Sequence, residues 1–236
     1  MNIGIIAPIE YLEFSTTNFH ICYSDLLSSK TYLDFYKAKS KSKKNTVILD
    51  LSPDLPRLKI NNARLLEGLD IIKPTYIVLP SVDFSWERTV NLSNSFVDTY
   101  DDILSPKTIG VLQGVDLDSL AKCYSGLKDI SDIIGLGSSL ERLARREEIV
   151  RDLKITKPTI YLEVLSDPFE ELPCTNCLGV CTSFPVRLAQ DLRTLEEYRP
   201  TPPSLNFNIP KGKLLEDLVV RNIGDYISAV REGVRV

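Results

Sequence analysis

Short apolar runs recur along the chain, and a stretch with helical spacing follows most of them. Strands that are buried on both faces of a parallel sheet have this continuous apolar pattern. Eight runs are therefore predicted to be strands: Ile3–Ala7, Phe19–Tyr23, Thr46–Asp50, Thr75–Pro80, Thr108–Gln113, Asp132–Leu136, Thr159–Val164 and Leu178–Cys181. Helical spacing predicts helices at Leu26–Ala38, Ile60–Ile72, Trp86–Val97, Leu117–Leu127 and Leu140–Leu153.

The alternation of strands and helices predicts an α/β fold. Right-handed crossovers give a parallel sheet, and eight such units close a (β/α)8 barrel. A doubly wound open sheet is the main alternative, but the chain has no G-x-G-x-x-G turn after its first strand. We expect the barrel to span residues 1–200. Thr201-Pro-Pro203 marks the start of an extension over 201–236 with a terminal amphipathic helix.

Composition limits the classes of function. The 236 residues are 43% hydrophobic, with a formal charge of −4 and a pI near 5.2, so any contact with nucleic acid needs a local basic patch. The odd number of cysteines, five, indicates thiols in a reducing compartment. The first residues lack a basic leader, and no apolar run is long enough to span a bilayer. We expect a soluble, cytoplasmic protein without membrane contact, and leave open whether it forms homo- or hetero-oligomers.

The residues that follow the predicted strands are candidates for a functional site, because strand ends of a barrel meet on one face. They are Asp50, Ser81, Asp83, Gln113, Gly114, Gly135, Gly137, Tyr161, Glu163, Cys181 and Arg187. Asp50 is the preferred acid or base, since burial of its strand raises a carboxyl pKa. The amide of Gln113 suits the edge of a heterocyclic base. The glycines allow either close approach of a flat ligand or tight turns.

Three further features have competing interpretations. The basic run Lys37–Lys44 is either a solvated loop, which we prefer, or a phosphate-contact patch. Cys174-x2-Cys177-x3-Cys181 has one C-x2-C pair but no second pair, so no metal site is predicted, and no cofactor is expected. His20, the single histidine, is expected to be structural.

The strand ends, taken in order, resemble a known family. The segments are Val47–Asp50, Ile77–Ser81, Gly110–Gly114, Ile134–Gly137, Tyr161–Glu163 and Gly179–Arg187. Over residues 1–192 they resemble the guanine transglycosylase superfamily: the queuine and archaeosine tRNA-ribosyltransferases and the DNA-acting 7-deazaguanine enzymes of phages and bacterial islands. The resemblance implies a TIM barrel. It also implies a pentosyltransferase that exchanges guanine for a 7-deazaguanine-type base through a glycosyl-enzyme intermediate.

The resemblance assigns roles to individual residues. Asp50 matches the family's acid or base, Ser81 the base-reading position, and Gln113-Gly114 the segment that holds the base edge. Cys181 matches the nucleophile. The family has aspartates at the positions of Ser81 and Cys181, and a thiol is less suited than a carboxylate to attack at an anomeric carbon.

Three hypotheses follow. The first is an active base-exchanging enzyme, whose partners are DNA or tRNA and a purine or 7-deazapurine base. The second is a catalytically silent relative that binds nucleic acid or an active homologue. The third is an unrelated TIM-barrel enzyme that acts on a small metabolite. A basic stripe on the active face, built from Lys37–Lys44, Arg57, Arg187 and Arg193, would favour the first two by supplying phosphate contacts, and a closed acidic rim would favour the third.

Overall fold

The structure, a computed structural model, describes residues 2–51, 62–164, 176–195 and 205–233. Arg57, Cys174 and the predicted boundary Thr201-Pro-Pro203 lie outside the described residues.

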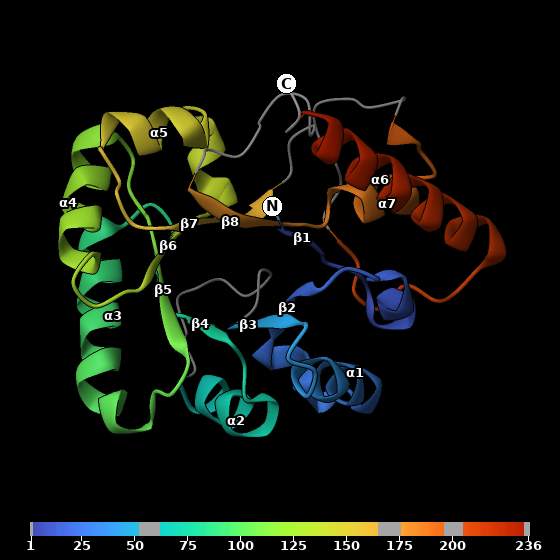
Figure 1. Ribbon diagram of the computed structural model, residues 1–236, viewed down its shortest axis with the longest axis horizontal. Helices are drawn as coiled ribbons and strands as arrows, with labels where there is room; N and C mark the ends of the chain where they lie inside the picture. The colour runs from blue at the N-terminus through green and yellow to red at the C-terminus, as the bar shows by residue number, and fades with distance from the viewer. Residues whose placement is uncertain (1, 52–61, 165–175, 196–204, 234–236) are drawn as a thin grey trace.

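Eight parallel strands form one sheet in the order β1-β8-β7-β6-β5-β4-β3-β2 (Figure 1). They are β1 (Asn2–Ile5), β2 (Phe19–Tyr23), β3 (Thr46–Asp50), β4 (Tyr76–Val78), β5 (Lys107–Val111), β6 (Ile133–Leu136), β7 (Thr159–Val164) and β8 (Cys177–Thr182). The two end strands approach closely, because a Cβ added to Gly4 on β1 would lie 2.9 Å from the carbonyl oxygen of Phe19 on β2. The sheet is a nearly closed barrel, and the predicted (β/α)8 fold is confirmed.

Helices lie outside these strands, to their left, below them and to their right in the view of Figure 1. The α-helices are α1 (Lys30–Ser40), α2 (Asn62–Ile72), α3 (Trp86–Tyr100), α4 (Leu117–Leu127), α5 (Arg146–Asp152), α6 (Phe184–Gln190) and α7 (Lys213–Gly233). The 3-10 helices are η1 (Ile9–Phe14), η2 (Ser24–Ser28), η3 (Asp101–Ile103) and η4 (Ser138–Arg142). Only η1 and no α-helix connects β1 to β2.

The single helix predicted over Leu140–Leu153 is wrong. The chain forms η4 and then α5, with Arg145 in an extended conformation between them. The break lets the side chain of Arg146 turn inward, where it is 0% exposed, donates from Nε to the carbonyl oxygen of Leu136 and pairs with Glu141. Helical spacing alone does not anticipate a charged side chain that satisfies buried carbonyl and carboxylate groups.

Alternate residues of each strand fill the barrel interior. The ring of Phe19 on β2 lies against Gly179 on β8, where an added Cβ would be only 2.8 Å from the ring. Gly135 on β6 is similarly crowded by Leu162, at 2.9 Å. Interiors are packed to near crystal density, so these glycines make room for large side chains from other strands. The interior below the strand ends is therefore a packed core and not a channel.

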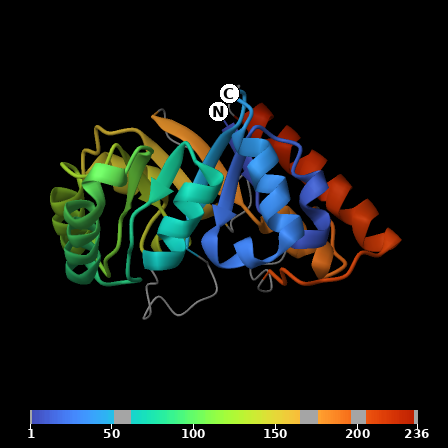
Figure 2. The same ribbon diagram turned by 90° about the horizontal axis from the view of Figure 1, so that it is seen from below.

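The terminal helix α7 packs against α6 and η1, and it covers the part of the barrel that lacks a helix between β1 and β2 (Figures 1 and 2). Its buried residues Val219, Ile223 and Tyr226 belong to the same apolar cluster as Phe184 of α6. The predicted C-terminal amphipathic helix is confirmed. In the described part of the chain, no helix is both long and apolar enough to cross a membrane.

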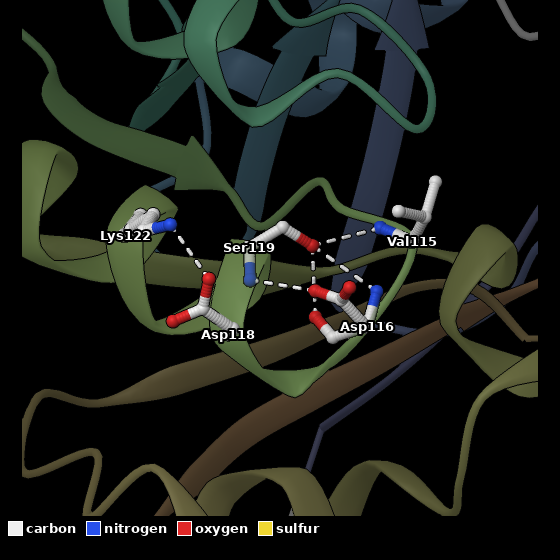
Figure 3. Close-up of polar contacts among 5 residues, drawn as sticks. All are labelled: Val115, Asp116, Asp118, Ser119 and Lys122. Carbon is white, nitrogen blue, oxygen red and sulfur yellow. Dashed lines mark hydrogen bonds and ion pairs between the residues drawn. The ribbon is translucent and has the colours of Figure 1, made fainter.

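The turn between β5 and α4 is fixed by a capping box (Figure 3). Asp116 accepts a hydrogen bond from the backbone N–H of Ser119 at 2.8 Å, and the Ser119 hydroxyl accepts from the backbone N–H groups of Val115 and Asp116. Such a box satisfies backbone donors that the helix leaves unpaired. The predicted N-cap at Asp116 is confirmed, and the loop that follows Gln113 is held close to the barrel.

The basic run Lys37–Lys44 lies at the amino ends of the strands, because it forms the end of α1 and the turn that leads into the start of β3. Within it, Lys39 lies over the ring of Phe35 and donates to the carbonyl oxygen of Ser15. In (β/α)8 barrels the carboxyl ends carry the active site and the amino ends contribute to stability. This run therefore does not contribute to a basic stripe on the active face.

Candidate functional site

Four side chains meet at the carboxyl ends of the strands, and we call Tyr23, Asp50, Glu163 and Arg187 the mouth cluster. Tyr23 and Asp50 end the neighbouring strands β2 and β3 and are partners in their register. Arg187, on α6, donates from Nη2 to Oε1 of Glu163 on β7 at 3.1 Å. Asp50 and Glu163 both act electrostatically on the Tyr23 phenol, which joins the two pairs into one cluster.

The Tyr23 phenol is buried, with 2% of the residue exposed. Burial raises its pKa well above the ordinary value, and the negative charges of Glu163 and Asp50 raise it further. The group therefore stays protonated near neutral pH and acts as a hydrogen-bond donor. Phe207 packs edge-on against its ring at 5.9 Å. Sequence reasoning missed Tyr23, although the alternation Phe19, Ile21, Tyr23 directs all three side chains to the interior.

Asp50 lies where the sequence places it, at the last position of β3 and partly exposed. Its Oδ1 accepts a hydrogen bond from the backbone N–H of Leu51 at 2.7 Å, which fixes the orientation of the carboxylate. The carboxylate is thus oriented at the mouth beside a protonated phenol.

Cys181 lies inside the barrel below this cluster and is 0% exposed. Burial raises the pKa of its thiol far above the ordinary value, and the charges of Cys177 and Asp50 act in the same direction. Because a thiolate and not a thiol is the nucleophile, this environment opposes the nucleophilic role that the sequence suggested. The thiol instead packs beside Gly4, whose added Cβ would lie 3.3 Å from Sγ.

Gln113 is engaged in a network that ties three loops together. Its Oε1 accepts from the backbone N–H of Phe84 at 3.1 Å and from the Ser139 hydroxyl at 3.3 Å, and its Nε2 donates to Asp83 at 3.2 Å. These contacts use most of the hydrogen-bonding capacity of the amide. Gln113 is therefore a brace between the β4, β5 and β6 loops, and not a free reader of a base edge.

Phe84, whose backbone N–H donates to Gln113, has an unusual backbone conformation. Its φ is 61°, in the left-handed region that bulky residues avoid, and 44% of the residue is exposed. Arg142 lies over the ring at 5.7 Å. Strain of this kind persists only where surrounding contacts impose it, and here the Gln113 amide holds the backbone N–H.

The remaining predicted site residues divide by position. Ser81 is buried just beyond β4, and Gly137 precedes η4 at the mouth. Gly114 is confined to a tight turn, because an added Cβ would lie 2.6 Å from the Ser119 hydroxyl oxygen. Gly135 lies within β6 under Leu162, in the packed interior. The two crowded glycines serve packing, so the close approach of a flat ligand is not needed to explain them.

Tyr161 is not part of the mouth. It pairs in register with Leu136 and Val180, which belong to an outer cluster, and its ring packs under the Arg146 guanidinium at 5.4 Å. The register of β7 against β8 shifts between Tyr161 and Val164, and Glu163 there has a φ of 54°. The irregularity turns Glu163, and not Tyr161, toward Arg187.

His20 faces outward from β2 and contacts the rings of Phe35 and Tyr36 edge-on. Burial, with the Lys39 charge as a second cause, lowers its pKa to about 4. The imidazole lies away from the mouth cluster, in agreement with a structural role. Across the described ranges, no three His, Cys, Asp or Glu side chains are grouped as metal ligands.

The fold and the mouth cluster define a (β/α)8-barrel protein with a polar site at the carboxyl ends of its strands. No protein-family model and no curated protein matches the chain. Among solved structures, it is similar to a putative lyase/mutase from Burkholderia cenocepacia J2315, with 12% identity, a TM-score of 0.46, and coverage of 78% of this chain and 76% of that one. It is also similar to N-acetylneuraminate lyase from Mycoplasma synoviae, with 12% identity, a TM-score of 0.45, and coverage of 81% and 74%. At 12% identity, the activities in these names describe those two proteins and are not assigned to this chain.

The predicted kinship with the guanine transglycosylases is wrong. No family model matches the chain, and the two similar structures carry the names of lyases and not of transglycosylases. The motifs behind that prediction are apolar strands that end in small or polar residues. Strands of any parallel barrel share this pattern, because the apolar run stops where the loop begins.

The partners predicted with that kinship, DNA or tRNA and a purine or 7-deazapurine base, are wrong for the same reason. Of the basic residues considered from the sequence, Arg187 lies at the mouth, whereas Lys37–Lys44 lies at the opposite end of the barrel and Arg193 pairs with its neighbour Asp191. The described part of the chain therefore does not bring these residues together as one basic stripe.

Proposed function

We propose that this chain is an enzyme that acts on a small metabolite by acid–base chemistry at the mouth cluster. The observation that carries the proposal is the convergence of Tyr23, Asp50, Glu163 and Arg187 from four parts of the barrel. Catalytic groups of (β/α)8 enzymes come from the ends of several strands in this way. This is the third of the three hypotheses drawn from the sequence.

Asp50 and Tyr23 suit complementary roles. The Asp50 carboxylate removes a proton from a carbon next to a carbonyl group of the substrate, and the electron pair of that C–H bond moves onto the carbonyl oxygen. The protonated Tyr23 phenol donates a hydrogen bond to the oxygen as it becomes negative, and such donors act most strongly where water is excluded. Return of the proton from Asp50 to carbon, or to another atom of the intermediate, completes the step.

Hydrogen exchange with solvent tests this step without knowledge of the full reaction. The protein is incubated in D2O with a panel of small carbonyl compounds that carry a carboxylate, a phosphate or no charge, and loss of the C–H signal is followed by NMR. Asp50→Asn is expected to slow exchange by about 10²–10⁴-fold, and Tyr23→Phe by about 10²–10³-fold.

Tyr76→Phe is the matched control, because Tyr76 is the first residue of β4 and pairs in register with Lys107, the first residue of β5, at the amino ends of the strands. It removes the same hydroxyl from a site far from the carboxyl ends, and exchange should continue at the parent rate. Absence of exchange across the panel, or exchange that survives Asp50→Asn, contradicts the proposed function.

A further inference from the structure

Arg187 is a buried cation with unused donor capacity. The residue is 8% exposed, its side chain 10%, and its described ion-pair partner is Glu163. Among the described residues, its Nε has no hydrogen-bond partner. A guanidinium carries five N–H donors in a rigid fork that matches the oxygens of a carboxylate or phosphate. The great majority of buried donor groups in protein structures have a hydrogen-bond partner, so this unpaired Nε calls for an explanation.

Ser183 adds a second group of the same kind. Its hydroxyl is buried and also has no partner among the described residues, and the residue is 1% exposed. Ser183 precedes Arg187 by four positions, and its carbonyl oxygen accepts from the Arg187 backbone N–H at 2.9 Å, so both side chains lie on one face of the first turn of α6. Two buried donors without acceptors thus occur together at the end of β8.

Glu163 reaches Arg187 from a strained backbone. Three of the described non-glycine residues with positive φ, Lys73, Lys154 and Leu192, directly follow or nearly follow a helix, where this conformation is ordinary. Glu163 instead lies within β7, at the irregularity in its register with β8. Strain in a strand at the mouth of a barrel indicates a functional constraint. The carboxylate occupies one edge of the Arg187 fork, at Nη2, and leaves Nε unpaired.

We propose that Arg187 and Ser183 form an oxyanion subsite that holds the carboxylate or phosphate group of the substrate, while Glu163 sets the position of the guanidinium. This inference deepens the proposed function and rests on it, because the subsite would anchor the metabolite on which Asp50 and Tyr23 act. The substrate class is a small carbonyl compound with an oxyanion group. The Glu163 carboxylate repels the bound group, and this repulsion provides a distinctive test.

The experiment titrates the full chain with inorganic phosphate and with acetate, against chloride at matched ionic strength. NMR follows the Nε–Hε signal of Arg187, which is assigned by its loss in Arg187→Lys, and the backbone N–H signals at the mouth, which also report binding in the Arg187 variants. We expect a saturable shift with at least one of the two oxyanions and none with chloride. Tighter binding of phosphate indicates a phosphorylated substrate, and tighter binding of acetate indicates a carboxylic acid.

Two substitutions should change oxyanion binding in opposite directions. Arg187→Met should weaken it by about 10- to 100-fold, the usual effect of losing a charged hydrogen bond. Glu163→Gln should strengthen it by about fivefold, because a repelling charge is removed and the side chain can still accept from Arg187. A purely structural ion pair predicts no effect on oxyanion binding from either change. If Arg187→Met does not fold, Arg187→Lys and Glu163→Gln carry the same test.

The inference is overturned if neither oxyanion gives a saturable shift, if backbone signals at the mouth respond equally in the Arg187 variants, or if Glu163→Gln weakens binding. Asp50→Asn separates the two proposals. Oxyanion binding without any hydrogen exchange supports the subsite and contradicts the acid–base function. Hydrogen exchange that depends on Asp50 but not on Arg187 supports the acid–base function and contradicts the oxyanion subsite.

Discussion

The amide of Gln113 holds together the loops that follow β4, β5 and β6, so its removal should cost stability and not only ligand binding. Gln113→Ala loses the hydrogen bonds to the Phe84 N–H, Asp83 and Ser139. Three bonds at about 1 kcal/mol each, less for the partly solvated Asp83 contact, give a loss of about 2–3 kcal/mol in the free energy of unfolding. In a domain of this size, the midpoint of thermal unfolding should fall by about 4–12 °C.

Urea unfolding followed by tryptophan fluorescence measures this loss. Trp86 is the only tryptophan and lies two residues after Phe84, so it reports on the affected loop. Gln190→Ala is the matched control, because Gln190 exchanges two hydrogen bonds with Asn206 at the surface, and a change within about 0.5 kcal/mol is expected. A cost for Gln113→Ala as small as that of the control would refute the interpretation of Gln113 as a brace.

Further predictions concern packing and titration. Gly179→Ala should lower the free energy of unfolding by about 1–3 kcal/mol, because its Cβ would meet the Phe19 ring at 2.8 Å. In a double-mutant cycle, Phe19→Leu should restore part of this loss. An equal loss with Phe19 and with Leu at that position would contradict the contact. Cys181 should resist iodoacetamide at pH 8 until the protein unfolds, since burial raises the pKa of its thiol, whereas partly exposed Cys177 should react. Mass spectrometry measures the labelling of each cysteine, and labelling of Cys181 in the native protein would disprove this. The pKa of His20 is lowered to about 4, so the unfolded chain binds the proton first and stability should fall by about 3 kcal/mol as pH drops from 6.5 to 4. Above pH 6.5 this contribution is fully present, and a His20→Leu variant with the same slope in urea titrations would show that another group is responsible.

The fold was predictable because its strands are buried on both faces. Runs such as Thr46–Asp50 and Thr159–Val164 are continuous and apolar, and the structure gives both strands the predicted bounds. The Asp116 cap was predictable because it depends on neighbours three residues apart. The break in the predicted helix Leu140–Leu153 could not be predicted in this way. It depends on a contact between Arg146 and a carbonyl oxygen on β6, and local helix propensity carries no information about such a distant partner.

The site was predictable only in part, for reasons of side-chain direction. Asp50, Glu163 and Arg187 lie at the mouth as strand order implies. Tyr161 does not, because it lies between the inward-facing residues Ile160 and Leu162 and faces outward. Alternation alone would place Glu163 on that same outer face, and the register irregularity after Tyr161 changes its direction. Tyr23 was missed because an aromatic residue at the end of an apolar run resembles core, although strand alternation directs it inward.

A crystal structure of the protein with bound malonate tests the central claim most directly, because malonate offers both a carboxylate for Arg187 and an acidic C–H bond near Asp50. The account predicts one malonate carboxylate on the Arg187 guanidinium and the Ser183 hydroxyl, with the central carbon facing Asp50 and Tyr23. Malonate bound at another place, with Arg187 and Glu163 unchanged and the mouth cluster without ligand, would contradict it.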